Sequence, residues 1–133
     1  MSQALLGDKI ELGSVTPRRD LTYVDDTVRG FLAVGSADLM PDETFVLGTG
    51  KDISVAELVS EVGGVVGRDL QVEHRAARMR PAGSEVDRLV AGPARLEQVT
   101  GWSPQVSLAD GLRMTVEWVR AHSGRYRTDE YAI

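Results

Sequence analysis

Apolar residues recur at helical spacing in three stretches of the chain, and short extended runs separate these stretches. In the clearest stretch, Ser54 and Glu57 have the spacing of a capping box at a helix start. Apolar side chains follow on one helical face, namely Val55, Leu58, Val59 and Val62. Because helices and strands alternate with no repeat and no linker, the pattern predicts one domain of mixed α/β (α+β) class.

The other long helices are predicted from similar signals. Asp25 or Asp26 is expected to cap a helix that places Val28, Phe31 and Leu32 on one face. The last helix is expected to start at Ser107 with an apolar stripe of Leu108, Leu112, Thr115 and Val119. Two shorter helices are predicted over residues 3–6, closed by Gly7, and from Pro93 to Val99, closed by Gly101. The count is four to five helices.

Four short extended runs are predicted as strands, over residues 9–12, 21–24, 44–47 and 70–73. Gly67 is the expected end of the helix that starts at Ser54. The Arg-rich run 76–83, broken by Pro81, is expected to be an ordered loop. A polar tail over 124–133 would follow a domain formed by residues 1–123.

Composition excludes several classes of function. The 20 acidic residues outnumber the 15 basic ones and give a net charge of -5, so we expect no nucleic-acid partner. No cysteine is present, which excludes disulfides and thiolate ligands. No run of the sequence approaches the roughly 18 apolar residues of a membrane span. We therefore expect a soluble, cytoplasmic protein with no membrane partner.

Common catalytic patterns are missing from the sequence. The two histidines, His74 and His122, lie far apart, so no metal site is predicted. The run Gly48-Thr49-Gly50 has Ile53 where a dinucleotide-binding loop needs its third glycine. These glycines are expected only to turn the chain from a strand into a helix. The adjacent carboxylates Asp25 and Asp26 are interpreted as helix caps rather than an acid–base pair.

Two arginines suit a phosphate ligand. Arg19 precedes an extended run, and Arg80 precedes Pro81 in the predicted loop. A guanidinium presents a planar fork of donors that fits a phosphate or a carboxylate. The residues alone leave two interpretations open, namely a pyrophosphate site and ordinary exposed salt bridges.

Seven segments, in order, match a set of family motifs. They are residues 9–14 (I-x-L-G), 19–27 (R-D-F-x-Y-V-x-D-T), 45–50 (Y-N-L-G-S-G), 53–58 (the helix start that follows), 78–86 (R-x-R-P-x-x-S-E-V), 101–104 (G-W-x-P) and 108–112 (L-x-x-G-L). In this respect the chain resembles the extended short-chain dehydrogenases/reductases, the NAD-dependent nucleotide-sugar epimerases and dehydratases of carbohydrate biosynthesis. Within this family, the motifs most resemble those of the bacterial 4,6-dehydratases. One departure is Val46, where the family commonly has Asn.

The resemblance implies a fold and a site. The fold would be the C-terminal substrate-binding portion of a Rossmann-type, NAD(P)-binding enzyme. Arg19 and Arg80 would contact the diphosphate of a nucleotide diphosphate sugar, and Glu85 would contact the ribose. The backbone of Leu12, Gly13 and Ser14 would lie near the base.

The family's glycine-rich NAD loop and Tyr-x-x-x-Lys pair have no counterpart in the sequence. We therefore expect a truncated chain that is inactive alone, with no catalytic residue and no cofactor of its own. NAD(P) would belong to the full-length parent, which oxidises a sugar hydroxyl to permit elimination or epimerisation. The partner would be a complementary dinucleotide-binding chain or a second copy in a homo-oligomer. The alternative is a non-catalytic module that self-associates or binds a partner protein or a nucleotide.

Overall fold

The computed structural model describes residues 1–38, 42–79 and 86–125. Twelve helices and strands are defined there. In chain order they are α1 (Ser2–Leu6), β1 (Lys9–Leu12), β2 (Arg18–Arg19), α2 (Val24–Ser36), β3 (Ile53–Ser54), α3 (Val55–Val66), β4 (Gln71–His74), the 3-10 turn η1 (Ala76–Arg78), β5 (Arg88–Leu89), α4 (Ala94–Thr100), α5 (Leu108–Ala121) and the 3-10 turn η2 (Ser123–Arg125). The mixed α/β class and the count of five α-helices are confirmed.

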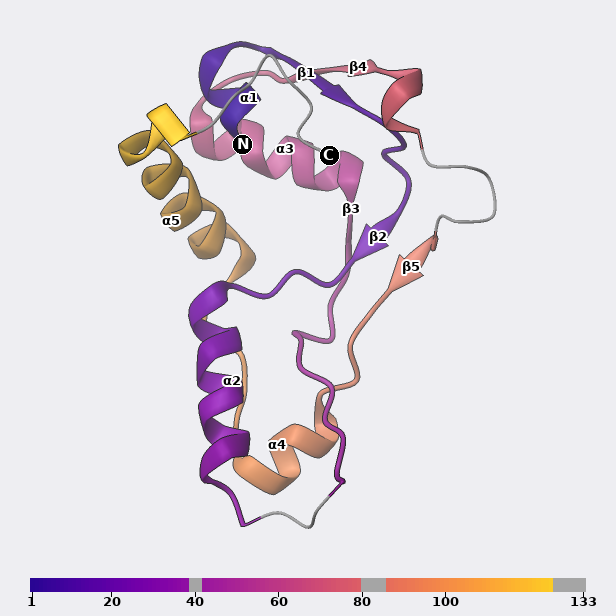
Figure 1. The fold of residues 1–133 in the computed structure, drawn as a ribbon. Coiled ribbons are helices and arrows are strands. Elements are labelled where there is room, and N and C mark those ends of the chain that lie inside the picture. The colour runs from indigo at the N-terminus through magenta and orange to yellow at the C-terminus, as the bar shows by residue number, and fades with distance from the viewer. Residues whose placement is uncertain (39–41, 80–85, 126–133) are drawn as a thin grey trace.

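The molecule is elongated, with one small sheet at one end and a second small sheet near its middle (Figure 1). Strands β1 and β4 pair in parallel, from Lys9 opposite Gln71 to Leu12 opposite His74. In the second sheet β2 lies in the middle, antiparallel to β3 and parallel to β5. Helices α1 and α3 lie beside the first sheet and α5 packs against α3, whereas α2 and α4 form the opposite end (Figure 1).

The main core lies where α1, β1, α3 and α5 meet. Its buried members are Ala4, Ile10, Val62 and Leu112. The stripe predicted on α5 supplies part of this packing, since Leu112 belongs to the cluster and Leu108 packs against it. At the other end α2 packs closely at Gly30, where an added Cβ would lie 2.0 Å from Cδ1 of Leu47.

Local signals at helix ends are confirmed. The hydroxyl of Ser54 accepts a hydrogen bond from the Glu57 N–H at 3.1 Å, and the Glu57 carboxylate accepts one from the Ser54 N–H at 2.8 Å. Ser107 accepts from the Asp110 N–H in the same way at 3.1 Å. Gly67 and Gly101 end α3 and α4 with φ near +70°, at 72° and 71°, a conformation that glycine adopts without strain.

Two sequence predictions at helix and strand ends are wrong. Tyr23 is the N-cap residue of α2, so neither Asp25 nor Asp26 caps it. The extended pairing predicted over 21–24 occurs instead at Arg18–Arg19, because the β5 backbone pairs there. Gly7 is the C-cap residue that ends α1, as predicted, and its φ of -164° is extended backbone that any residue adopts.

Residues 44–47 form no strand. The segment was predicted as a strand because it is a short apolar run that Gly48 and Gly50 end. In the structure its side chains alternate between half-buried and exposed. That alternation comes from side-chain packing, since Leu47 lies against Gly30 of α2 and the Arg95 guanidinium lies 6.0 Å from the centre of the Phe45 ring. No ladder partner for this segment exists among the described residues.

The predicted Arg-rich loop is described only in part. Residues 76–78 form η1, whereas 80–83 lie outside the described residues, as does the tail from 126 onward. No helix in the described part of the chain is long and apolar enough to cross a bilayer.

Replacing Ser54 with Ala should lower the free energy of unfolding by about 1 kcal/mol, because α3 loses the hydroxyl that accepts the Glu57 N–H. Urea unfolding measures the loss. Ser60→Ala is the matched control, since Ser60 lies exposed on the same helix. Equal destabilisation by both substitutions would contradict a capping role for Ser54.

Candidate functional site

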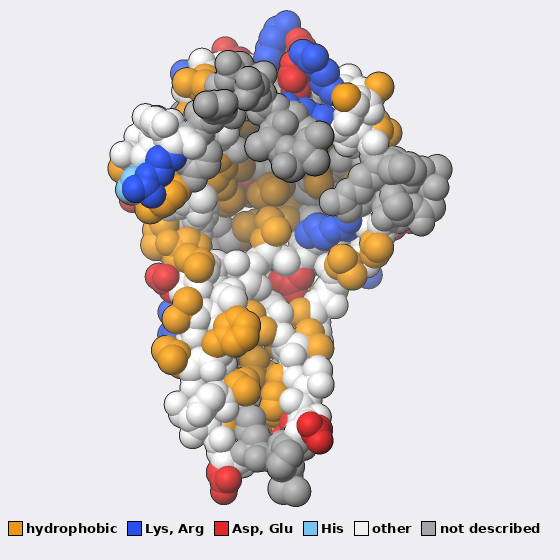
Figure 2. Space-filling view, viewed as in Figure 1, with side chains coloured by type: hydrophobic (Ala, Val, Ile, Leu, Met, Phe, Trp, Pro, Cys, Tyr) orange, Lys and Arg blue, Asp and Glu red, His pale blue; other side chains and the backbone are white. Residues whose placement is uncertain are grey.

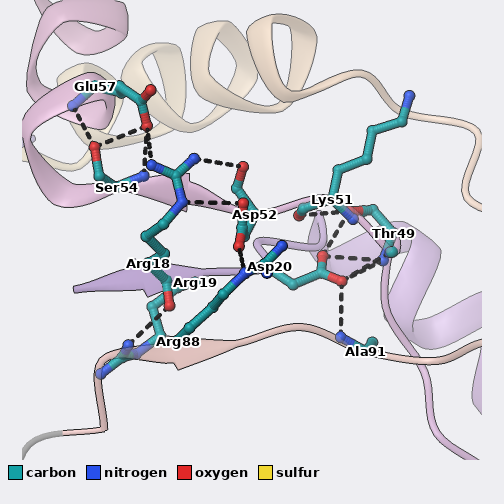
Figure 3. Close-up of polar contacts among 11 residues, drawn as sticks. Arg18, Arg19, Asp20, Thr49, Lys51, Asp52, Ser54, Glu57, Arg88 and Ala91 are labelled. Carbon is teal, nitrogen blue, oxygen red and sulfur yellow. Dashed lines mark hydrogen bonds and ion pairs between the residues drawn. The ribbon is translucent and has the colours of Figure 1, made fainter. Parts of the chain in front are cut away.

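The central strand β2 carries charged residues that bind segments far apart in the sequence (Figure 3). Its backbone is held by β5, since the Arg18 N–H donates to the Asp87 carbonyl at 2.7 Å and the Asp20 N–H donates to the Leu89 carbonyl at 3.0 Å. β2 therefore fixes where Arg18, Arg19 and Asp20 lie relative to the chain around β5.

Asp20 accepts several hydrogen bonds from backbone N–H groups. Its carboxylate lies 3.0 Å from the Thr49 nitrogen, 2.8 Å from the Gly50 nitrogen and 3.2 Å from the Ala91 nitrogen. The Thr49 hydroxyl donates to the same group at 2.5 Å (Figure 3). The amide groups of the Gly48–Gly50 loop therefore bind an anion that the protein itself supplies.

Asp52 joins two arginines. Nε of Arg18 lies 3.1 Å from its Oδ1, and Nε of Arg88 contacts its Oδ2. A second carboxylate, Glu57, lies 3.0 Å from an Arg18 nitrogen. The Asp52 side chain is only 9% exposed, so this ion pair is more shielded from solvent than an ordinary surface pair. The network links β2, the segment before β3, and β5 (Figure 3).

Contacts within this network shift the pKa values of Arg18, Asp52 and Glu57. The hydrogen bond from Arg88 is the largest effect that holds the pKa of Asp52 below its ordinary value, and Arg18 acts in the same direction against the effect of burial. Hydrogen bonds from Ser54 are the main cause of the lowered pKa of Glu57. The hydrogen bond to Asp52 is the largest effect that raises the pKa of Arg18. The three groups are therefore charged at neutral pH.

Asp26 carries a buried carboxylate in the first turn of α2. It is 0% exposed and accepts hydrogen bonds from the Gln105 and Val106 N–H groups, each at 2.9 Å. Arg29 also contacts the carboxylate, and the indole N–H of Trp102 donates to the Asp26 carbonyl at 3.1 Å. The side chain predicted to cap a helix thus binds the turn that precedes α5.

Three of the six predicted site residues lie together at the end of β1. An added Cβ at Gly13 would lie 2.1 Å from the Arg78 carbonyl oxygen, so only glycine fits there. The Arg78 side chain donates to the Glu11 carbonyl at 2.7 Å. Leu12, Gly13 and Ser14 therefore lie against the turn that directly precedes Arg80 in the sequence.

Arg19 lies elsewhere, on β2. Its guanidinium donates to the Arg18 carbonyl at 2.8 Å, and its backbone lies opposite Leu89 of β5. Arg80 and Glu85, the other two predicted site residues, lie outside the described residues. Whether Arg19 and Arg80 share a pyrophosphate cleft therefore stays a prediction.

A cleft with a volume of about 510 Å³ is lined in part by Thr49 and Asp52. The rest of its wall comes from residues 51, 53 and 104–108, together with Leu21. None of the predicted site residues that the structure describes lines this cleft. In the described part of the chain, no three His, Asp or Glu side chains gather as a metal site would require.

Asp20, Asp26 and Asp52 were missed as structural anions by the sequence analysis. Asp20 and Thr49 are separated by 29 positions, and Asp26 and Gln105 by 79. No spacing rule relates such pairs. The motif segment that contains Asp20 and Asp26 was the available signal, but it gave no indication of what their carboxylates bind.

Comparison with known proteins decides the family. The family model described as GDP-mannose 4,6 dehydratase matches residues 1–115. The chain belongs to this family. It is a member of the NAD-dependent epimerases/dehydratases among the extended short-chain dehydrogenases/reductases, as the sequence motifs indicated.

Relatives and solved structures agree with this assignment. The UDP-glucose 4-epimerase of Mycolicibacterium smegmatis is 33% identical over 124 residues, covering 92% of this chain and 38% of that protein. The UDP-glucose 4-epimerase of Thermotoga maritima, solved with UDP-glucose, superposes with a TM-score of 0.79 at 28% identity, over 92% of this chain and 38% of that one. MoeE5, solved with UDP-glucuronic acid and NAD, superposes with a TM-score of 0.73 at 28% identity, over 89% and 38%. The chain spans 38% of the length of each of these proteins.

Replacing Arg88 with Gln should raise the pKa of Asp52, because its largest charged hydrogen bond is lost. A carboxylate with a depressed pKa adds stability above its ordinary pKa, and that stability is lost as the pH falls through the folded value. NMR titration of the side-chain carboxyl carbon measures the shift. Arg113→Gln is the matched control and should raise the pKa of Asp110 alone, since Arg113 helps to lower that value. An unmoved Asp52 in the Arg88 variant would contradict the assigned cause.

Proposed function

We propose that this chain is the nucleotide-sugar-binding part of an NAD-dependent 4,6-dehydratase or epimerase. The NAD-binding loop and the Tyr–Lys catalytic pair would lie on polypeptide outside these 133 residues. The extent of the match supports this division, since nearly all of the chain aligns with 38% of a UDP-glucose 4-epimerase. The solved relatives that contain UDP-glucose or UDP-glucuronic acid support the ligand class.

One geometric observation carries the proposal. Two predicted ligand-binding elements lie beside the two described ends of the segment that contains Arg80 and Glu85. Gly13, in the middle of Leu12–Ser14, lies against Arg78, and Arg19 lies opposite Leu89. A nucleotide bound there would have its base near Leu12–Ser14 and its ribose near Glu85. The two arginines would neutralise its phosphates with paired donors.

The described residues do not fit NAD. Phosphates of a dinucleotide bind to the free N–H groups of a glycine-rich loop at a helix start. Gly48–Gly50 is the segment most like such a loop, and Asp20 already accepts the N–H groups of Thr49 and Gly50. The cofactor is therefore assigned to the part of the enzyme outside this chain, and no redox step is derived for these residues.

Arg19→Ala and Arg80→Ala should each weaken nucleotide binding roughly 10- to 100-fold, because a hydrogen bond to a charged group contributes about 1.5–3 kcal/mol. UDP-, GDP- and dTDP-sugars, with and without NAD, are first compared by thermal shift, and calorimetry then gives Kd for the ligand that binds. Arg113→Ala is the control, since Arg113 pairs with Asp110 on α5. Unchanged affinity in both variants would refute the assigned site.

A second candidate is supported by the surface of α2. Phe31 is 74% exposed and Leu32 is 65% exposed, and Val24 and Val28 lie exposed on the same helix. Figure 2 shows apolar side chains at the surface over the α2 half of the molecule. Exposed apolar patches often mark interfaces. The α2 face would be covered by a second copy or by a partner protein if the chain acts as a non-catalytic module.

Phe31→Asp should shift the chain to a monomer if α2 mediates self-association, because a carboxylate at the contact would have to be buried. Sedimentation at tens of micromolar measures the species present. Leu6→Asp is the matched control, since Leu6 is an exposed apolar residue on α1. A monomer in the unmodified protein would exclude a second copy as the molecule that covers the α2 face.

A further inference from the structure

The Gly48–Gly50 loop is built around an anion. Three backbone N–H groups, from Thr49, Gly50 and Ala91, point to the Asp20 carboxylate over distances of 2.8 to 3.2 Å. Successive backbone N–H groups of this kind form concave sites that bind phosphate or carboxylate in other proteins. Here the bound carboxylate is the side chain of Asp20, so the site is occupied without any external anion.

The loop geometry depends on two glycines. An added Cβ at Gly48 would lie 2.2 Å from the Ala91 Cβ and 2.9 Å from an oxygen of Asp20. Gly50 has φ of 73°, in the left-handed region that most side chains disfavour. Both glycines allow the chain to approach the Asp20 side chain closely. They are therefore explained without any external ligand.

Asp20 also connects the two parts of the proposed nucleotide site. It directly follows Arg19, and its own N–H donates to the Leu89 carbonyl of β5 at 3.0 Å. Its carboxylate holds the Ala91 N–H just beyond β5. One side chain thus fixes the end of β2 to the segment that follows Glu85, as well as to the loop before β3.

We propose that Asp20 is the positioning residue of the nucleotide site. Its carboxylate takes the place that a phosphate would occupy in a glycine-rich loop, and so holds Arg19 in register with β5. Asp20 does not touch the ligand in this proposal. The positioning role rests on the proposed function, whereas the internal anion site does not.

The anion site is tested without any nucleotide by chemical rescue. Asp20→Ala removes the carboxylate and leaves three N–H groups without their acceptor. Its melting temperature should fall, and sodium formate should restore part of the loss, whereas sodium chloride at equal ionic strength should not. Asp110→Ala is the control, because that carboxylate is half-exposed and its contacts are with Ser107 and Arg113, each three residues away. If formate and chloride act equally on Asp20→Ala, the internal anion site is refuted.

The positioning role is tested with ligands of increasing charge. The ligands are the one of UDP, GDP and dTDP that binds most tightly and its free nucleoside. Asp20→Ala should lower the affinity for the diphosphate at least 10-fold and the affinity for the nucleoside less than 2-fold. Formate should restore the affinity for the diphosphate. General damage to the fold would weaken both ligands equally, and that result overturns the positioning role. If Asp20→Ala does not fold, Asp20→Asn replaces it, because the amide keeps the shape but loses the charge.

The two proposals fail in different ways. If the unmodified protein binds none of the three diphosphates, the proposed function is refuted, and the positioning role is refuted with it. Formate rescue of stability would in that case still identify Gly48–Gly50 as a loop that closes on its own anion. If the unmodified protein binds a diphosphate and Asp20→Ala binds it equally well, only the role of Asp20 is overturned.

Discussion

The structure depends on carboxylates that accept backbone N–H groups from distant segments. Asp26 is the extreme case, because it is 0% exposed and binds the N–H groups of Gln105 and Val106. A buried carboxylate without partners would cost several kcal/mol, so α2 and the turn before α5 must form together. The Trp102 indole adds a third contact to the same residue, through the Asp26 carbonyl. The α2 end of the molecule is thereby fixed to α5.

The sequence predicted those features that are decided within a few residues. Ser54 with Glu57, Ser107 with Asp110, and the glycines that end α3 and α4 all act over one helical turn, and their signals were sufficient. The errors share another cause. Residues 44–47 form a short apolar run that is typical of a strand but gain their burial from side-chain packing. Asp26 lies at a helix start but binds a turn 79 positions away. Local patterns contain no information about such partners.

The candidate site also contains residues that the sequence motifs selected and neighbours that they did not. The motif resemblance selected Leu12–Ser14, and the structure adds a physical reason, since Gly13 alone fits against the Arg78 carbonyl. It also selected Arg19 without its neighbour Arg18, whose contacts with Asp52 and Glu57 organise β2. Arginines in a ligand site and arginines in an ion-pair network look alike in a sequence. The structure assigns Arg18 and Arg88 to an ion-pair network, since both contact Asp52, whereas the ligand role of Arg19 stays a prediction.

The second sheet explains why side-chain anions are needed at all. Strands β2, β3 and β5 are each two residues long, so their ladders provide few hydrogen bonds, and β5 is exposed. A sheet of this size has little stability of its own, because it lacks a buried apolar face. Asp52 bridges β2 and β5 through their arginines, and Asp20 connects both strands to the Gly48–Gly50 loop. Charge-assisted hydrogen bonds are stronger than neutral ones, so a few of them can replace a longer ladder. Asp20 and Asp52, which directly adjoin its strands, therefore hold the sheet that carries Arg19 in place.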